Sequence, residues 1–271
     1  MTTQKLQRII GFSDLQAFQD CPRKWAITQN WATPKPPINM FRGSIFHDIC
    51  SQFYDQSFKW SPDKHVPGFD SLRSDDMNDI KEAMSQAKQM AQTYLNSEFT
   101  QGIKAVSVDK QLVFKDSIGD IRIGGHPDIV AIHNGQYVLI EFKTGDRPDP
   151  VSYNLSGQSD YYALLWNEQP ENKDKQISYI YLDLVSEKGQ CTRHQRPPNR
   201  AAGEYILYQL QVMASQVDTE EKIKQHYGNP HYSGRCAWCS NLKVSQAMDN
   251  GDDWPELLEK YYIFKATGER R

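Results

Sequence analysis

Apolar residues in the N-terminal third of the chain recur mainly with the period of an α-helix. Ile45, Ile49 and Phe53, for example, repeat at i, i+4 and i+8, which places them on one helical face. A proline inside such a pattern divides or kinks the helix. The pattern predicts three helical stretches: one that follows Ser13 and is divided at Pro22, one from Gly43 to about Phe58, and one from Asp75 to about Phe99.

Beyond residue 104 the apolar positions alternate with period two, which is typical of β-strands. Segments with this pattern are 105–114, 120–125, 127–132, 137–143 and 177–185, and helices are predicted at 156–166 and within 196–215. The order predicts an α/β fold with a mixed, mainly antiparallel central sheet flanked by helices. We expect one domain over 1–271, with a helical N-terminal part at 1–104, the sheet core at 105–185 and a helical, cysteine-containing extension at 186–271.

The dipeptide Asn134-Gly135 lies between two apolar runs, which is the sequence signal for a two-residue hairpin turn. Counting outward from this turn along both strands, Asp128 lies opposite Glu141. Directly opposed residues point to the same face of a sheet. Lys143, two residues beyond Glu141, shares that face because side chains alternate along a strand.

Two opposed carboxylates repel each other, so their presence in a strand pair needs an explanation. An exposed strand pair with scattered charges is one interpretation. Apolar residues on the charged face argue that helices cover both faces; they are Val130, Ile132, Tyr137 and Leu139. Partly buried carboxylates need a countercharge, which a divalent cation supplies. From the spacing alone both interpretations remain open.

Composition narrows the class of protein without naming a function. With 24% charged and 38% hydrophobic residues, the 271-residue chain is ordinary for a globular protein. No apolar run reaches the roughly 20 residues that a membrane helix needs, and no secretory signal is recognisable, so we expect a cytoplasmic protein. A net charge of -3 neither indicates nor excludes nucleic-acid binding.

The hairpin and three other elements resemble the PD-(D/E)XK nucleases, and within them the RecB-like branch. Pro127-Asp128 followed by Glu141-Phe142-Lys143 resembles the motif that gives the family its name. Three further elements resemble motifs of the branch: Gly43 to His47 its G-x-x-x-H element, Gln158 to Tyr162 its Q-x-x-x-Y element, and Phe12 to Pro22 its N-terminal helix. The resemblance implies a restriction-endonuclease-like core. It extends to CRISPR-associated, recombination and phage RecB-like exonucleases.

The resemblance implies a role for each of these residues. The metal ion, Mg²⁺ or Mn²⁺, would be bound by Asp128, Glu141, the backbone carbonyl of Phe142 and His47. Mn²⁺ is included because imidazole is a better ligand for it than for Mg²⁺. Lys143 would orient the attacking water and stabilise developing negative charge. Gln158 and Tyr162, one helical turn apart, would position the lysine or contact the DNA backbone. Each also has a structural alternative: His47 as a surface or core histidine, Gln158 as a solvated residue, and Tyr162 as a packing residue.

Many members of the branch hold an iron–sulfur cluster with one N-terminal and three C-terminal cysteines. Cys21, Cys236 and Cys239 match three of those positions, but Ser245 stands at the fourth. Because such a cluster normally takes four thiolates, we expect none here. A three-thiolate site with a labile cluster, or a zinc ion completed by His226 or His231, is the alternative.

The resemblance predicts a metal-dependent nuclease that acts on single-stranded or duplex DNA ends, in recombination, repair or phage and CRISPR DNA processing. It could work with a protein partner in such a complex. A structure-selective endonuclease and a non-cutting DNA-binding subunit are the alternatives. The intact Asp128, Glu141 and Lys143 set argues against a subunit that does not cut. A basic stretch at 193–200 is interpreted as a solvated loop, with contact to the DNA backbone as the alternative.

Overall fold

A computed structural model of the chain describes residues 8–32, 38–58, 74–146, 148–219, 222–223 and 263–264. The chain divides into two compact units. The first, here called the sheet unit, comprises Pro36–Phe114 and Gly125–Ile206. The second, here called the helical unit, comprises Met1–Lys35, Lys115–Gly124 and Leu207–Arg271. Every candidate residue named above for the nuclease site belongs to the sheet unit, whereas the candidate iron–sulfur and zinc ligands belong to the helical unit.

The sheet unit is built on five strands in the order β3-β6-β7-β8-β9. Their bounds are β3 Lys104–Val108, β6 Ile129–His133, β7 Gln136–Gly145, β8 Ile177–Ser186 and β9 Cys191–Arg196. Neighbouring strands are antiparallel except for β7 and β8, which run parallel and are joined through helices. This confirms the mixed, mainly antiparallel sheet that the sequence predicts.

The β6–β7 hairpin has the predicted register. His133 pairs with Gln136 and Ile129 with Ile140. Asn134 and Gly135 both have positive φ values, 51° and 77°, as a type I′ turn requires. The turn chemistry therefore determines which residues of the two strands meet.

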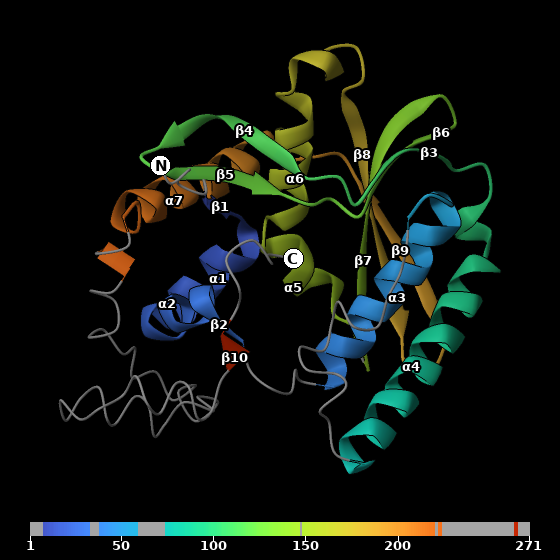
Figure 1. The fold of residues 1–271 in the computed structure, drawn as a ribbon. Helices are drawn as coiled ribbons and strands as arrows, with labels where there is room; N and C mark the ends of the chain where they lie inside the picture. Colours follow the sequence, from blue (N-terminus) through green and yellow to red (C-terminus); the bar gives the residue numbers. More distant parts are fainter. Residues whose placement is uncertain are drawn as a thin grey trace. The chain divides into compact units, whose positions relative to one another are not determined.

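Helices cover both faces of this sheet, as Figure 1 shows. Helices α3 (Ile38–Tyr54) and α4 (Ser74–Leu95) lie on one face, and α5 (Pro150–Leu155) and α6 (Gln158–Asn167) lie on the other. Two single-turn 3-10 helices, η3 (Glu98–Thr100) and η4 (Pro170–Asn172), follow α4 and α6. The α3–α4 side forms a core with the inward residues of β6 and β7, among them Ile140 and Phe142. Residues on either side of β7 are therefore shielded from water.

Some element boundaries differ from the prediction. Helix α3 begins at Ile38, five residues before Gly43, and ends at Tyr54. The segment 105–114, expected as one strand, is divided by a turn at Asp109, whose φ is 43°. The chain continues as β4 (Leu112–Ile118), which pairs in a second sheet of order β1-β5-β4.

The helical unit contains α1 (Phe12–Asp20) and α2 (Pro22–Asn30), so the predicted division at Pro22 is confirmed. Helix α1 begins one residue before Ser13, and the Asp14 carboxylate accepts a hydrogen bond from the Gly11 amide at 3.1 Å. The remaining elements are β1 (Arg8–Ile10), β2 (Trp31–Ala32), β5 (Ile121–Gly125), β10 (Ile263–Phe264) and α7 (Arg200–Gln216), which begins in the sheet unit.

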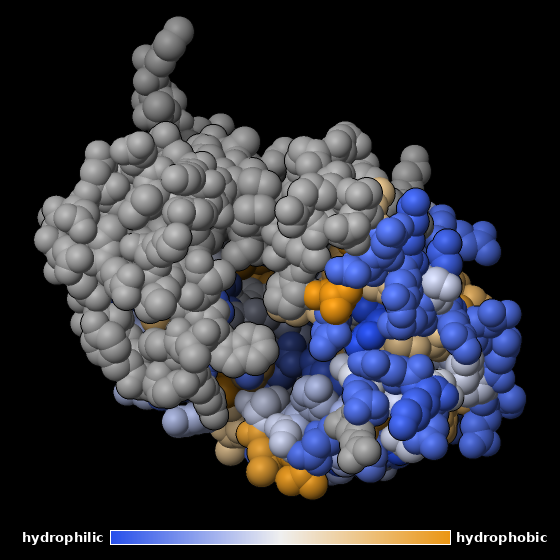
Figure 2. Space-filling view, turned by 90° about the horizontal axis from the view of Figure 1, so that it is seen from below, coloured by the Kyte–Doolittle hydropathy of each residue, from blue (hydrophilic) through white to orange (hydrophobic). Residues whose placement is uncertain are grey.

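Figure 2 shows a mainly hydrophilic surface over the described residues, with hydrophobic side chains in small separate groups. Within the described part of the chain, no helix combines the length and apolar character needed to cross a membrane.

A buried ion pair links the neighbouring strands β8 and β9 on the α4 side of the sheet. Both oxygens of Asp183, which is 1% exposed, accept hydrogen bonds from the Arg193 guanidinium at 2.6 Å. The Tyr94 hydroxyl on α4 donates to the same carboxylate at 2.8 Å. The Arg193 guanidinium also stacks on the Phe99 and Tyr181 rings. One buried negative charge thus holds α4, β8 and β9 together.

We expect Tyr94→Phe to lower the free energy of unfolding by about 1–3 kcal/mol, because the buried carboxylate loses a hydrogen-bond donor. Urea unfolding followed by tryptophan fluorescence measures the change. Tyr208→Phe is the matched control: Tyr208 is 59% exposed, and its substitution should change stability by less than about 0.5 kcal/mol. Equal effects of the two substitutions would contradict the role of the Asp183 cluster.

Candidate active site

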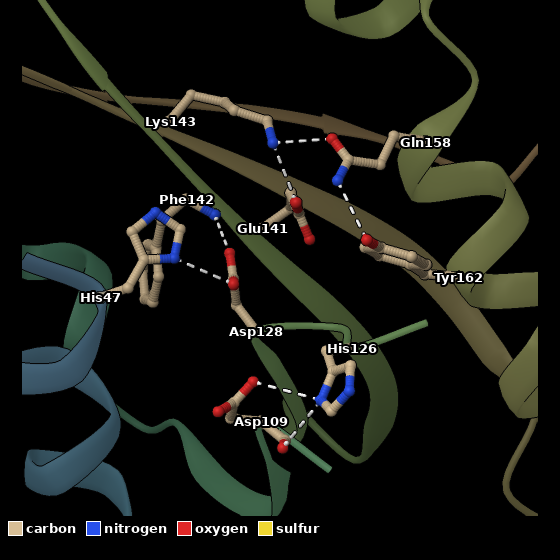
Figure 3. Close-up of polar contacts among 9 residues, drawn as sticks. All are labelled: His47, Asp109, His126, Asp128, Glu141, Phe142, Lys143, Gln158 and Tyr162. Atoms are coloured by element: carbon tan, nitrogen blue, oxygen red, sulfur yellow. Dashed lines mark hydrogen bonds and ion pairs between the residues drawn. The ribbon is translucent and has the colours of Figure 1, made fainter. Parts of the chain in front are cut away.

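The two predicted carboxylates meet at the end of the β6–β7 hairpin, as Figure 3 shows. Glu141 lies within β7, whereas Asp128 lies just before β6 begins at Ile129. One Asp128 oxygen accepts a hydrogen bond from the backbone amide of Phe142 at 2.7 Å. The carboxylate is therefore held against the β7 backbone next to Glu141, where the register placed it.

Lys143 lies beside Glu141 and is held by two acceptors. Its Nζ donates to Glu141 Oε1 at 2.9 Å and to Gln158 Oε1 at 2.7 Å. The Gln158 amide nitrogen in turn donates to the Tyr162 hydroxyl at 3.1 Å. The structure thus brings all four side chains into one hydrogen-bonded chain, which extends from β7 onto α6.

His47 reaches the same place from α3. Its Nδ1 lies 3.0 Å from Asp128 Oδ1. Gly43, one turn earlier, explains how the helix comes so close: a Cβ there would lie only 3.0 Å from Thr144 Oγ1 at the end of β7. The spacing of Gly43 and His47 therefore combines a close helix–strand approach with a side chain that contacts Asp128.

A second glycine makes room for Tyr162. A Cβ on Gly125 would lie 2.5 Å from the Tyr162 ring, so the ring packs directly on the backbone there. The next residue, His126, is half-exposed, and its Nδ1 lies 3.4 Å from the carbonyl oxygen of Asp109 and 3.6 Å from the Asp109 carboxylate (Figure 3). The Asp109 amide donates to the carbonyl of Asp128 at 2.9 Å, which ties this pair to the site.

Burial and mutual repulsion determine the charge state of the carboxylates. Burial and the nearby Asp128 charge raise the pKa of Glu141 to about 7, against the opposing effect of Lys143. Burial would also raise the pKa of Asp128, but the charge and hydrogen bond of His47, with Lys143 and the Phe142 amide, lower it. Asp128 thus stays ionised while Glu141 titrates near neutrality.

The cationic and phenolic groups respond to the same charges. Burial lowers the pKa of Lys143, but the Glu141 and Asp128 carboxylates outweigh that effect and the pKa is raised. Burial likewise lowers the pKa of His47, and the adjoining Asp128 carboxylate more than compensates. Burial and the charge of Glu141 raise the pKa of Tyr162, so its hydroxyl keeps its proton. Lys143 is therefore a fixed cation at neutral pH.

The carboxylates of Asp128 and Glu141 and the imidazole of His47 are chemically suitable ligands for a divalent cation, although among the described residues they are not already arranged around one point. Glu141 Oε2 is buried and has no hydrogen-bond partner among the described residues, so one negatively charged oxygen lacks compensation. The described residues contain no group of three or more His, Cys, Asp or Glu side chains already positioned as a metal site. The Asp128 oxygens are instead occupied by His47 and the Phe142 amide. A carboxylate oxygen that accepts one hydrogen bond keeps a second lone pair, so the Asp128 oxygens can still bind a cation beside Glu141 Oε2.

The basic stretch at 193–200 is neither a loop nor a free cationic surface. Arg193 and Arg196 lie on β9, and each makes a bidentate ion pair with a buried carboxylate. Arg200 is exposed, but it pairs with Glu168 and Glu204. The expectation of a solvated loop was wrong for the two strand residues, because Arg193 and Arg196 each pair with a buried acid, on opposite faces of the sheet.

Of the three cysteines that match iron–sulfur ligand positions, Cys21 lies within the described residues. Cys21 is buried between α1 and α2, and its Sγ accepts a hydrogen bond from the Lys24 amide at 3.4 Å. Cys236, Cys239 and Ser245, and the candidate zinc ligands His226 and His231, lie outside the described residues. The absence of an iron–sulfur cluster therefore stays a prediction.

Comparison with known proteins identifies the family. The family model of the PD-(D/E)XK nuclease superfamily matches residues 10–244, which is most of the chain. The chain belongs to this superfamily. Nucleases of this superfamily generally use divalent metals such as Mg²⁺ or Mn²⁺, and the family implies DNA as the substrate. No match to a curated protein was found.

One solved structure supports the fold of this member of the superfamily. A protein from Eubacterium rectale named "Putative exonuclease" aligns over 89% of this chain and 90% of its own, with 11% sequence identity and a TM-score of 0.53. The structure of SSO0001 aligns over 90% of this chain and 88% of its own, with 14% identity and a TM-score of 0.37. Only the first bears on the fold, and it confirms the predicted nuclease-like architecture.

Sequence analysis did not single out every residue that contacts the site. Tyr153 on α5 places its ring 5.6 Å from Lys143 Nζ, and no motif marks it. Asp109 was taken as part of a strand, and only its positive φ identifies it as a special position.

The raised pKa of Glu141 predicts how stability depends on pH. A carboxyl group whose pKa rises on folding stabilises the fold below its unfolded value of about 4.5, and this contribution is lost as the pH rises through about 7. In EDTA, the free energy of unfolding of the wild type should therefore fall relative to Glu141→Gln between about pH 5 and about pH 8. Urea unfolding of both proteins across that range measures the difference. A difference that does not change with pH would contradict the assignment.

Proposed function

We propose that this chain is a metal-dependent deoxyribonuclease that hydrolyses phosphodiester bonds at DNA ends. The observation that supports this most directly is the pair of adjoining carboxylates, buried Glu141 and partly buried Asp128, beside a lysine whose Nζ lies 2.9 Å from Glu141 Oε1. Like charges in this position destabilise the fold unless a ligand uses them. A nuclease would use them to hold a cation against a phosphate.

Asp128, Glu141, the backbone carbonyl of Phe142 and His47 are the groups that would hold the cation. A bound Mg²⁺ or Mn²⁺ neutralises phosphate charge and lowers the pKa of water. His47 either joins this set or, through its 3.0 Å contact, orients Asp128. Both roles predict weaker metal binding when the imidazole is removed.

Lys143 serves as a charged donor rather than as a base, because its raised pKa keeps it protonated. A fixed cation at this point orients the attacking water and stabilises the negative charge that develops on the phosphoryl oxygens. Gln158 holds the ammonium group from α6 at 2.7 Å, and Tyr162 holds Gln158. These two residues therefore position the lysine.

Cleavage from an end is the mode that we propose, within the RecB-like branch. The Eubacterium rectale neighbour is named an exonuclease, and the G-x-x-x-H and Q-x-x-x-Y elements both contribute residues to one site. We infer a cytoplasmic enzyme of recombination, repair or phage and CRISPR DNA processing, working alone or with a protein partner. A structure-selective endonuclease is the second candidate. The single-domain organisation over 1–271 likewise stays a proposal.

We expect Asp128→Ala, Glu141→Ala and Lys143→Ala each to lower the cleavage rate by about 100-fold or more, because each removes charge stabilisation at the reacting phosphate. The assay uses end-labelled linear duplex, linear single strand and covalently closed circle. Exposed Lys173→Ala is the control and should cut at the wild-type rate.

Release of short products from linear DNA with the circle left intact would support the exonuclease, and cutting of the circle would favour the endonuclease. Binding of DNA without any cleavage, by a folded wild type supplied with metal, would contradict the nuclease proposal and leave the binding subunit.

The cation is tested separately from cleavage. EDTA should abolish activity, and Mg²⁺ or Mn²⁺ should restore it. Either ion should also raise the melting temperature, since it binds only the folded carboxylates. His47→Ala should weaken Mn²⁺ binding by about 10-fold or more if the imidazole is a ligand or orients one. Titration calorimetry measures this, and an unchanged Mn²⁺ affinity would remove His47 from the metal site.

A further inference from the structure

A single guanidinium, that of Arg196, ties together the two helices that flank Lys143. Its two terminal nitrogens donate to the two Asp160 oxygens at 2.6 and 2.7 Å, which fixes α6. Its Nε donates to Asn154 Oδ1 at 2.9 Å, which fixes α5. Arg196 lies at the end of β9, so an outer strand of the sheet holds both helices.

Asp160, the acceptor of this contact, is held from several sides. It is 3% exposed, and the backbone amide of Asn199 donates to one of its oxygens at 2.7 Å. A Cβ on Gly203 would lie 2.7 Å from the Asp160 carbonyl oxygen, so the first turn of α7 packs directly on this part of α6. The N-terminal turn of α6 is therefore rigidly placed, and this turn carries Gln158.

Both contacts made to Lys143 by these helices depend on the same placement. Gln158, two residues before Asp160, lies 2.7 Å from Lys143 Nζ. Tyr153, the residue before Asn154, places its ring 5.6 Å from the same atom. The Arg196 guanidinium thus binds one residue on each helix, and that residue lies within two positions of the side chain by which the helix contacts Lys143.

Stability alone is a weak explanation for this ion pair. Removing two charges from water costs about as much as their attraction returns, and apolar side chains of similar volume often stabilise as well or better. What the pair provides is geometry, because a planar fork fixes both distance and angle. The Arg193–Asp183 pair on the same strand is also bidentate, at 2.6 Å, but Asp183 is held by Tyr94 of α4, and among the described residues this pair makes no hydrogen bond with α5 or α6.

We propose that Arg196 is a positioning residue for the active-site lysine, acting through Asp160 and Asn154. It holds Gln158 and Tyr153 where they keep the Lys143 ammonium group beside Glu141. This inference rests on the proposed function only for the role of Lys143 in cleavage. The placement of the lysine itself is measurable without any activity.

The first test is a double-mutant cycle on single-turnover cleavage. Arg196→Lys keeps the charge but cannot bridge both helices, and it should lower the rate about 10-fold with the KM for DNA changed less than about twofold. In a Gln158→Ala background, the same change should cost only about twofold more, because the Gln158 hydrogen bond it acts through is already gone and only the Tyr153 contact remains to be lost. Arg193→Lys, the matched control, should lower the melting temperature and leave the rate within about twofold.

The second test does not need catalysis. Limited acylation by an amine-reactive ester, read by peptide mass spectrometry, reports how firmly the Lys143 amine is held. Its rate should rise severalfold in Arg196→Lys and stay unchanged in Arg193→Lys. Asp160→Asn provides the same comparison if Arg196→Lys does not fold.

Equal rate losses from Arg196→Lys in both backgrounds, with unchanged acylation of Lys143, would overturn the positioning role and leave a structural one. A different outcome would separate the two proposals. If the wild type never cuts DNA, but Lys143 is acylated faster in the Arg196→Lys variant than in the wild type, the positioning role is supported and the proposed function is contradicted.

Discussion

Two carboxylates that repel each other are held together at the end of one hairpin. The neighbouring elements of the sheet unit supply the groups that offset this repulsion. Asp128 is stabilised by the His47 ring and the Phe142 amide, while the one hydrogen bond to the Glu141 carboxylate among the described residues comes from Lys143 and leaves its second oxygen buried without a partner. The result is an ionised Asp128 next to a Glu141 whose pKa is raised to about 7. This uneven compensation is the physical basis for expecting a cation.

Each flank of the hairpin supplies one part of the compensation. Helix α3 provides His47. The helix can approach β7 closely because Gly43 has no side chain; a Cβ at this position would crowd Thr144. Helix α6 provides Gln158, which shares the lysine with Glu141. The sheet separates these contributions, because α3 covers the Phe142 face of β7 and α6 covers the Glu141 face (Figure 1).

Ion pairs on β9 hold the scaffold on both faces of the sheet. Successive residues of a strand point to opposite faces of the sheet, so Arg193 and Arg196, three residues apart, also point to opposite faces. Arg193 meets Asp183 beneath α4, and Arg196 meets Asp160 beneath the start of α6. A segment that the sequence predicts to be a basic loop thus forms two buried ion pairs. Arg193 pairs with Asp183, its register partner on the adjacent strand, and Arg196 pairs with Asp160, which is 36 residues away in the sequence.

The sequence by itself determined the hairpin and what it carries. The Asn134-Gly135 turn sets the register, and the register brings Asp128 to Glu141 and Lys143 because pairing within a hairpin is local. The spacing of Gln158 and Tyr162 likewise placed both on one helical face. Only the tertiary structure decided that His47 contacts Asp128, that Tyr153 lies over Lys143, and that Arg196 joins α5 to α6. These contacts join residues on separate elements, and the packing of those elements depends on the whole core rather than on any local pattern.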